Sequence, residues 1–263
     1  MPNVASSGLP NRASYDASSP DVVVDRVTGL SWQRVVSPDS YGLHRQNDYC
    51  EGLTLAGHSD WRLPSMIELA SISDTSQVDP AADPVAFANT PSEPFWSSQT
   101  DITNTGLGWY LLFKSGGTFI GNDVTRLARA RCVRGRSSCA GVEVSPYSVT
   151  GDLVHDRYTG LTWQRTVEHD NYTWQGANAR CSSLGSNGGG WRLPTLRELL
   201  TLVDVTHYDP AIDASAFPGT PSEFFWSSSP SRAPAGSAWG VNFTRGASGA
   251  GFVITAAHVR CAR

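Results

Sequence analysis

The chain has 263 residues, 40% of them hydrophobic, and carries 20 basic and 24 acidic side chains. Up to Arg134 there are 10 basic and 14 acidic residues, a net charge of −4, and the rest of the chain has 10 of each. Neither half is the basic surface that nucleic acid binding requires. No apolar run approaches the ~20 residues that span a bilayer. We therefore expect no nucleic acid partner and no membrane insertion.

The first twenty residues are rich in Ser, Asn, Ala and Pro, which predicts a flexible leader over 1–20. This segment contains no apolar h-region of a secretory signal, so we expect an exported form to have had its signal removed.

An internal repeat governs the rest of the chain. VVVDRVTGLSWQR (22–34) returns as LVHDRYTGLTWQR (153–165), DWRLPSMIEL (60–69) returns as GWRLPTLREL (190–199), and RC at 131–132 returns at 260–261. Each unit has the size of an ordinary domain, which favours a tandem duplication over a solenoid. The sequence predicts one domain over 21–134 and a second over 148–263, joined by a linker at 135–147.

In chain order, each copy reads as strands, two helices and further strands. VVVD favours a short strand, Thr28-Gly29 a turn, and LSWQR an alternating strand. YGLHRQNDYCEGL has the spacing of a helix, and a second helix follows WRLP. We expect the later strands of copy one at EPFWSS, GWYLLFK, GTFIG and ARCVR. We expect an α+β fold with two helices and a small antiparallel sheet per copy, closed by the first and last strands.

The duplicated WRLP motif marks the start of the second helix. We expect Trp61 to anchor the core, Arg62 to pair with a buried acid, and Pro64 to occupy the first helical position. Ser65 and Glu68 have the spacing of a capping box, which Thr195 and Glu198 repeat. Ligand contact by this motif is the alternative.

The cysteines form one equivalent pair in each copy. Cys50 and Cys181 lie in the first helix, and Cys132 and Cys261 lie in the last strand. We predict disulfides Cys50–Cys132 and Cys181–Cys261, which indicate an oxidising compartment. Buried free thiols are the alternative. Cys139, in the linker, is left as a free thiol or a link between chains.

Catalytic signals are weak. None of the six His falls on a His of the other copy, and no hydrolase, metalloprotease or nucleotide-binding motif is present. We expect a protein that is not an enzyme and needs no cofactor. Asp74, Asp79 and Asp83, which the second copy repeats, could bind Ca²⁺ or could simply cap turns.

The tryptophans separate into repeated and unrepeated positions. Trp32, Trp61, Trp96 and Trp109 recur in copy two, which predicts core positions. Tyr41 and Trp174 are the better candidates for exposed rings that stack on sugars.

Each copy contains an ordered set of motifs: D-x-x-TGL-x-WQR, a helix Cys, WRLP-x-x-x-EL, FWSS and a terminal RC. Through these motifs each copy resembles the C-terminal domain family of the Legionella collagen-like adhesin, over about 22–134 and 153–263. The resemblance implies a C-type-lectin-like fold, an extracellular or cell-surface location, and adhesion or ligand binding. The named adhesin domain is similar to binders of sulfated glycans and forms trimers, so a homo-oligomer is one expectation.

In lectin-like folds the ligand face is formed by loops before and between the last strands. Here these loops are 99–108 with 115–129, and 229–237 with 245–256, the segments that differ most between the copies. The candidate ligand contacts are polar side chains in and next to them: Asp101, Asn104, Lys114, Asn122, Asp123 and Arg126 in copy one, and Arg232, Asn242 and Arg245 in copy two. Neutral loop drift would produce the same divergence.

The main hypothesis is therefore a secreted or surface-displayed bacterial protein that binds a glycan or a surface protein. A structural assembly module of a surface layer or appendage is the second hypothesis. The third is an enzyme, since formylglycine-generating enzymes share the lectin-like fold, although fold alone does not carry function.

Overall fold

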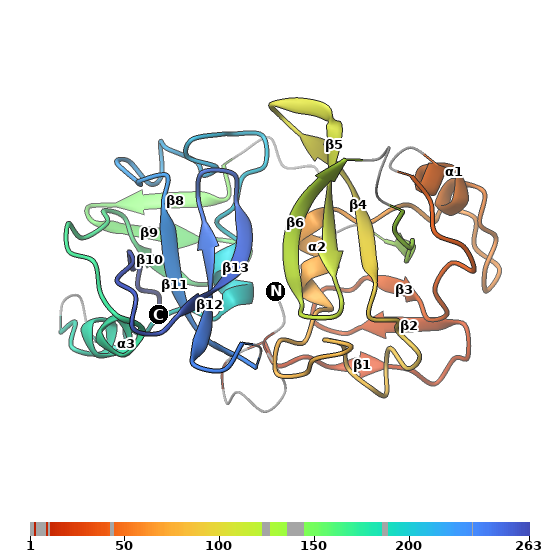
Figure 1. Ribbon diagram of the computed structural model, residues 1–263, viewed down its shortest axis with the longest axis horizontal. Helices are drawn as coiled ribbons and strands as arrows, with labels where there is room; N and C mark the ends of the chain where they lie inside the picture. Colours follow the sequence, from red (N-terminus) through yellow and green to blue (C-terminus); the bar gives the residue numbers. More distant parts are fainter. Residues whose placement is uncertain are drawn as a thin grey trace. The chain divides into compact units, whose positions relative to one another are not determined.

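A computed structural model describes most of the chain. The described residues are 3, 9, 11–42, 45–122, 127–135, 145–185, 189–232 and 234–263, with the side chain of Asn122 left out. The chain divides into two compact units, Met1–Ala140 and Gly141–Arg263, called domain 1 and domain 2 below and described one at a time (Figure 1).

Domain 1 contains two small antiparallel sheets and two short helices. Its elements are β1 (Tyr15–Asp16), β2 (Val22–Asp25), β3 (Ser31–Gln33), α1 (Arg45–Glu51), α2 (Met66–Ser71), β4 (Pro94–Asp101), β5 (Asn104–Leu112), β6 (Gly117–Asn122) and β7 (Val133–Arg134). One sheet has the order β1-β2-β3-β7 and the other the order β4-β5-β6.

Domain 2 repeats this plan. Its elements are β8 (Tyr147–Thr150), β9 (Leu153–Asp156), β10 (Thr162–Gln164), α3 (Trp174–Ser182), α4 (Leu196–Leu200), β11 (Phe224–Ser231), β12 (Ser237–Asn242) and β13 (Ala247–Phe252). The sheets have the orders β10-β9-β8 and β11-β12-β13. In place of a last strand, an isolated antiparallel bridge joins Trp163 to Ala262.

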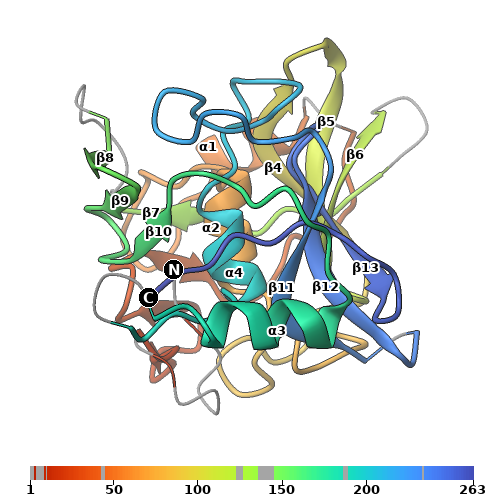
Figure 2. The same ribbon diagram turned by 90° about the vertical axis from the view of Figure 1, so that its left-hand side faces the viewer.

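The second helix of each domain covers the long sheet. α2 packs against β4 and β5, and α4 packs in the same way against β11 and β12 (Figures 1 and 2). The repeated tryptophans lie in the core, since Trp32, Trp96, Trp163 and Trp226 have no exposed surface, and Trp96 and Trp226 pack in the clusters around Cys50 and Cys181. The prediction that they form the core is confirmed, and their burial supplies much of the hydrophobic stabilisation of domains this small.

Each domain also has an arginine with no exposed surface. Arg131 and Arg260 are fully buried, and their guanidinium carbons lie 4.9 and 4.7 Å from the ring centres of Phe87 and Phe217. Burial lowers the pKa of both groups to about 9, so both stay charged at neutral pH. Stacking on an aromatic face recovers part of the hydration that each cation loses.

Two details differ from the sequence-based expectations. The first and last strands do not join the β4-β5-β6 sheet. Instead, β7 pairs with β3, and these strands form a separate sheet with β1 and β2. The leader is not wholly flexible: Tyr15–Asp16 forms β1, and the Tyr15 ring packs edge-on against Phe87. The linker, Cys139 included, falls almost entirely at 136–144, outside the described residues.

Candidate functional site

A disulfide fixes the first helix of each domain to the end of its chain segment. Cys50 is bonded to Cys132 and Cys181 to Cys261, which confirms the predicted pairing. The bonds join residues 82 and 80 positions apart, and all four sulfurs belong to fully buried cysteines. Closing loops of this length removes much conformational freedom from the unfolded chain.

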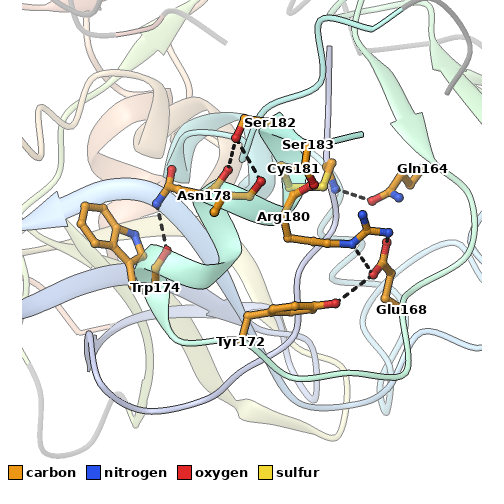
Figure 3. Close-up of a disulfide and its surroundings, with 11 residues drawn as sticks. Gln164, Glu168, Tyr172, Trp174, Asn178, Arg180, Cys181, Ser182 and Ser183 are labelled. Atoms are coloured by element: carbon orange, nitrogen blue, oxygen red, sulfur yellow. Dashed lines mark hydrogen bonds and ion pairs between the residues drawn. A yellow bond between two sulfur atoms is a disulfide. The ribbon is translucent and has the colours of Figure 1, made fainter. Parts of the chain in front are cut away.

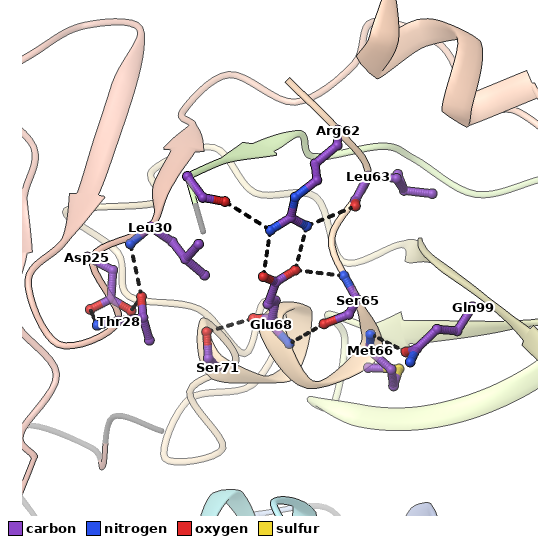
Figure 4. A network of polar contacts seen from close by, with 11 residues as sticks. Asp25, Thr28, Leu30, Arg62, Leu63, Ser65, Met66, Glu68, Ser71 and Gln99 are labelled. Carbon is purple, nitrogen blue, oxygen red and sulfur yellow. Dashed lines mark hydrogen bonds and ion pairs between the residues drawn. The ribbon is translucent and has the colours of Figure 1, made fainter. Parts of the chain in front are cut away.

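The turn between the first strands is built by a buried carboxylate. Asp25 accepts hydrogen bonds from the backbone N–H of Val27 and Thr28 and from the Thr28 hydroxyl (Figure 4). Gly29 follows with a φ of 73°, a value that glycine adopts without steric cost. Asp156 and Thr159 repeat these contacts in domain 2, so the D-x-x-TG motif forms a turn.

An arginine–glutamate pair orients the second helix. Arg62 donates from both terminal nitrogens to the two carboxylate oxygens of Glu68, at 2.7 Å each, and Glu68 also accepts from the Ser65 N–H (Figure 4). The hydrogen bond to Glu68 raises the pKa of Arg62. Both predicted capping boxes are present, because Thr195 and Glu198 form the same pair of bonds beside Arg192.

The expected role of Pro64 is wrong. The helix starts at Met66 with Ser65 as its N-cap, so Pro64 lies outside it. Its carbonyl instead accepts the Ser98 N–H at 2.8 Å, and the Gln99 side chain accepts the Met66 N–H (Figure 4). Both bonds tie the helix start to β4, and Ser228 and Ser229 make equivalent bonds to Pro194 and Leu196.

The contacts beside the disulfide differ between the domains. In domain 2, Arg180 on α3 forms a two-pronged ion pair with Glu168, which the Tyr172 hydroxyl also contacts (Figure 3). The hydrogen bond from Arg180 lowers the pKa of Glu168. In domain 1, Tyr49 takes the place of Arg180, stacks on Tyr41 and accepts a hydrogen bond from Gln33.

The predicted contacts do not form one face, because they lie at opposite ends of the long sheet. We define the tip of domain 1 as residues 101–106 with Asn122, and its base as the β5–β6 turn at 113–116. Pairing of Asp101 with Asn104 and of Leu107 with Asn122 brings the tip residues to one end. Lys114 lies at the base, and Asp123 and Arg126 are outside the described residues.

Asp101 braces the tip of domain 1 from inside. It is only 3% exposed, and one carboxylate oxygen accepts from the N–H and hydroxyl of Thr103 and from the N–H of Asn104. Asn104 in turn accepts the Gly106 N–H and is exposed. The tip therefore displays Ile102, Thr103, Asn104 and Thr105 on a fixed turn, the outer end of the hairpin formed by β4 and β5 in Figure 1.

Domain 2 splits in the same way. Its tip consists of residues 231–236 with 252–256, and its base is the β12–β13 turn at 243–246. Arg232 is exposed at the tip, whereas Asn242 and Arg245 lie at the base. Asn242 accepts the Thr244 N–H, and the Arg245 guanidinium lies 5.5 Å from the ring centre of Tyr208.

Neither ring proposed for sugar stacking is freely presented. Tyr41 stacks on Tyr49, and its carbonyl accepts from the Trp96 indole. Trp174 packs against the disulfide core and donates its indole N–H to the Ser227 carbonyl. The residues that sequence reasoning missed are Phe252 and Ile254, which are 59% and 83% exposed at the tip of domain 2. Copy one has Asn122 where copy two has Phe252, and this replacement is the signal that could have found Phe252.

The repeated aspartates act in turns. Asp74 accepts from the N–H and hydroxyl of Ser76, and Asp83 accepts from the N–H of Val85 and Ala86. Within the described residues, no group of three or more His, Cys, Asp or Glu side chains is arranged to hold a metal ion. In the same ranges, no helix has the length and apolarity needed to cross a membrane.

These features define a class of protein: two α+β domains, each closed by a disulfide, with one shared frame and different tips. The chain belongs to the Lcl C-terminal domain family, whose model matches residues 21–134 and 152–263. Membership in this adhesin-type family, together with two disulfides, suggests a surface role outside the cytoplasm. No curated protein matches the chain.

Proposed function

We propose that this protein is a secreted or surface-displayed binding protein whose tips recognise a glycan or a protein ligand. One observation carries the proposal. The turn, capping box, ion pair and disulfide of the frame repeat residue for residue in the two domains, whereas the tips do not. Conserving a frame while varying its loops is the pattern of binding scaffolds. A C-type-lectin-like ancestry of the fold is part of this proposal.

The chemistry of the domain 1 tip suits a polar ligand. The exposed residues Asn104 and Thr105, with an amide and a hydroxyl, follow the apolar Ile102, while the Thr103 hydroxyl is held by Asp101. Saccharides combine hydroxyl groups with apolar ring faces and need both kinds of contact. The buried Asp101 keeps the turn in place before binding, which lowers the entropic cost of recognition.

The proposal assigns no catalytic step and requires no cofactor. The frame carboxylates of Glu68 and Glu198 bind arginine and cap a helix. Such contacts are stabilising and leave these groups engaged in structure. Calcium dependence is tested directly by a chelator.

The experiment is a glycan array probed with the full chain, with and without chelator. Thr105→Arg places a long side chain at the tip of domain 1, and Lys114→Ala is its matched control at the base of the same sheet. We expect Thr105→Arg to lose at least tenfold in apparent affinity and Lys114→Ala to bind like the parent chain. Loss in the base variant alone would overturn the assignment of the tip. A chain that binds no saccharide would redirect the proposal to a protein ligand.

A further inference from the structure

The tip of domain 2 exposes two large apolar side chains. Phe252 is 59% exposed and Ile254 83%, and no other large hydrophobic side chain in the described ranges is as exposed as Ile254. They flank Val253, which is partly buried and packs against the disulfide core. Alternate residues therefore point inward and outward around one tight turn.

The backbone of this turn is held from three sides. The Val253 N–H donates to the Gly236 carbonyl and the Trp174 N–H donates to the Val253 carbonyl, both at 3.0 Å. A third bond, from the Thr255 N–H to the Phe252 carbonyl at 2.9 Å, closes the turn. The outward side chains are thus fixed in place, and their exposure is a property of the folded domain.

The fold does not require apolar residues at this position. Phe252 pairs with Ser237 on β12, and the residue at the same register of domain 1 is Asn122, paired with Leu107. The sequence continues with Asp123 in copy one and Val253 in copy two. The same strand end therefore forms with a polar residue in place of Phe252. Copy one continues with Val124-Thr125 where copy two has Ile254-Thr255, so the two sequences differ at Phe252 and Val253.

The strands that form this tip carry no negative charge, and the acids of the neighbouring segment are Glu168, which pairs with Arg180, and Asp170, which precedes Tyr172. Residues 224–263 contain no Asp or Glu, and the first turn of α3, which contacts the turn through Trp174, contains none either. Arg232 directly follows Ser231, which pairs with Ser237 beside Phe252. A cation and two apolar side chains therefore stand at one projecting end of the sheet.

We propose that this turn, residues 252–255, docks on a lipid surface that contains anionic headgroups. Phe252 and Ile254 would enter the boundary between headgroups and acyl chains, and Arg232 would bind lipid phosphate. Two exposed apolar side chains next to a cation match the boundary between acyl chains and anionic headgroups. The contact is shallow and needs no spanning helix, and it is independent of saccharide binding by domain 1.

The test is sedimentation of the full chain with vesicles of phosphatidylcholine containing ~30% phosphatidylglycerol. The variant Phe252→Ser/Ile254→Ser should lower the partition coefficient at least tenfold, because each side chain contributes its apolar burial. Arg232→Gln should lower it about fivefold at low salt, and should change nothing on pure phosphatidylcholine. Val85→Ser is the matched control, since Val85 is 72% exposed in domain 1 and should not matter.

Three results would overturn the proposal. The parent chain could fail to sediment with anionic vesicles, or the double serine variant could sediment as well as the parent chain. Alternatively, light scattering without lipid could show self-association that the double variant abolishes, which would make the turn a protein contact. Because the altered side chains are exposed, all variants should unfold at the same temperature as the parent chain.

Discussion

The two fully buried arginines, Arg131 and Arg260, allow one substitution to be compared in two settings of the same fold. Arg260 donates from one nitrogen to the carbonyls of Gln164 and Arg165 and from another to the Thr220 hydroxyl, all at 2.7 Å. Arg131 donates only to Thr90 at 2.8 Å, and its Nε and Nη1 have no partner in the described part of the chain. Replacing each arginine by methionine keeps most of the side-chain volume and removes the charge.

The expected difference follows from these contacts. Each substitution removes a charge that folding takes out of water. The free energy regained in this way should be similar in the two variants, because burial lowers the pKa of both groups to about 9. Arg260→Met loses two more hydrogen bonds from a charged donor, worth about 1.5–3 kcal/mol each. Arg131→Met loses further ring contacts, with Phe95 and Phe113 at 5.7 and 5.9 Å, worth about 1 kcal/mol together. We therefore expect Arg260→Met to cost its domain about 3 kcal/mol more.

Hydrogen exchange followed by mass spectrometry on the full chain measures this, because peptides from each domain report its own free energy of opening. Below pH 8 both guanidinium groups are protonated in the folded and unfolded chain, so the difference should be the same at pH 6 and pH 8. Equal losses in the two domains, or a larger loss for Arg131→Met, would refute the hydrogen-bond accounting.

Three further predictions concern the frame. Replacing Cys181 and Cys261 by serine should destabilise domain 2 by about 4 kcal/mol, measured by urea unfolding; an effect that reducing agent fails to reproduce in the parent chain would contradict this. Ser65→Ala should cost about 1 kcal/mol and speed hydrogen exchange at the Glu68 amide, while Ser65→Asp should retain the cap. Glu168→Gln should cost about 1 kcal/mol at neutral pH. Arg180 lowers the pKa of Glu168, so the ion pair stabilises the folded chain fully above pH 4.5, the ordinary pKa of the carboxyl group. This stabilisation is lost as the pH falls through the lowered pKa of the folded state. The free energies of unfolding of the parent chain and the variant should therefore converge in acid.

The repeat made the frame predictable from the sequence. A residue that recurs at the same place in two copies has survived two separate histories of substitution, and here such residues are buried or hydrogen-bonded. The cysteine pairing, the two capping boxes and the pairing of Arg62 with a buried acid followed from that comparison, and the structure identifies that acid as Glu68. Pro64 was misplaced because a proline fits the first helical turn and the position before an N-cap equally well. The capping box distinguishes the two, because Ser65 as N-cap places Pro64 before the helix.

The ligand face could not be read in the same way. Loops before and between the last strands are adjacent in sequence, but an antiparallel sheet sends consecutive turns to opposite ends. Asn104 and Lys114 are therefore separated by the length of β5. The register that decides this is set by pairings such as Leu107 with Asn122, which no local pattern reveals. The predicted ligand contacts are all polar side chains and therefore do not include Phe252 and Ile254. The exposure of these two side chains is a property of the folded turn.

Because the two domains share one frame, each serves as a control for the other. If an aromatic side chain at the end of β13 were needed for folding, domain 1 would carry one, yet Asn122 stands at the register of Phe252. If ionic contact beside the disulfide were needed, Tyr49 could not replace Arg180. Phe252→Asn, which introduces the copy one residue at this register, should therefore leave the stability of domain 2 within about 1 kcal/mol of its original value. A larger loss in urea unfolding would show that the apolar turn belongs to the frame, and its assignment as a docking element would fail.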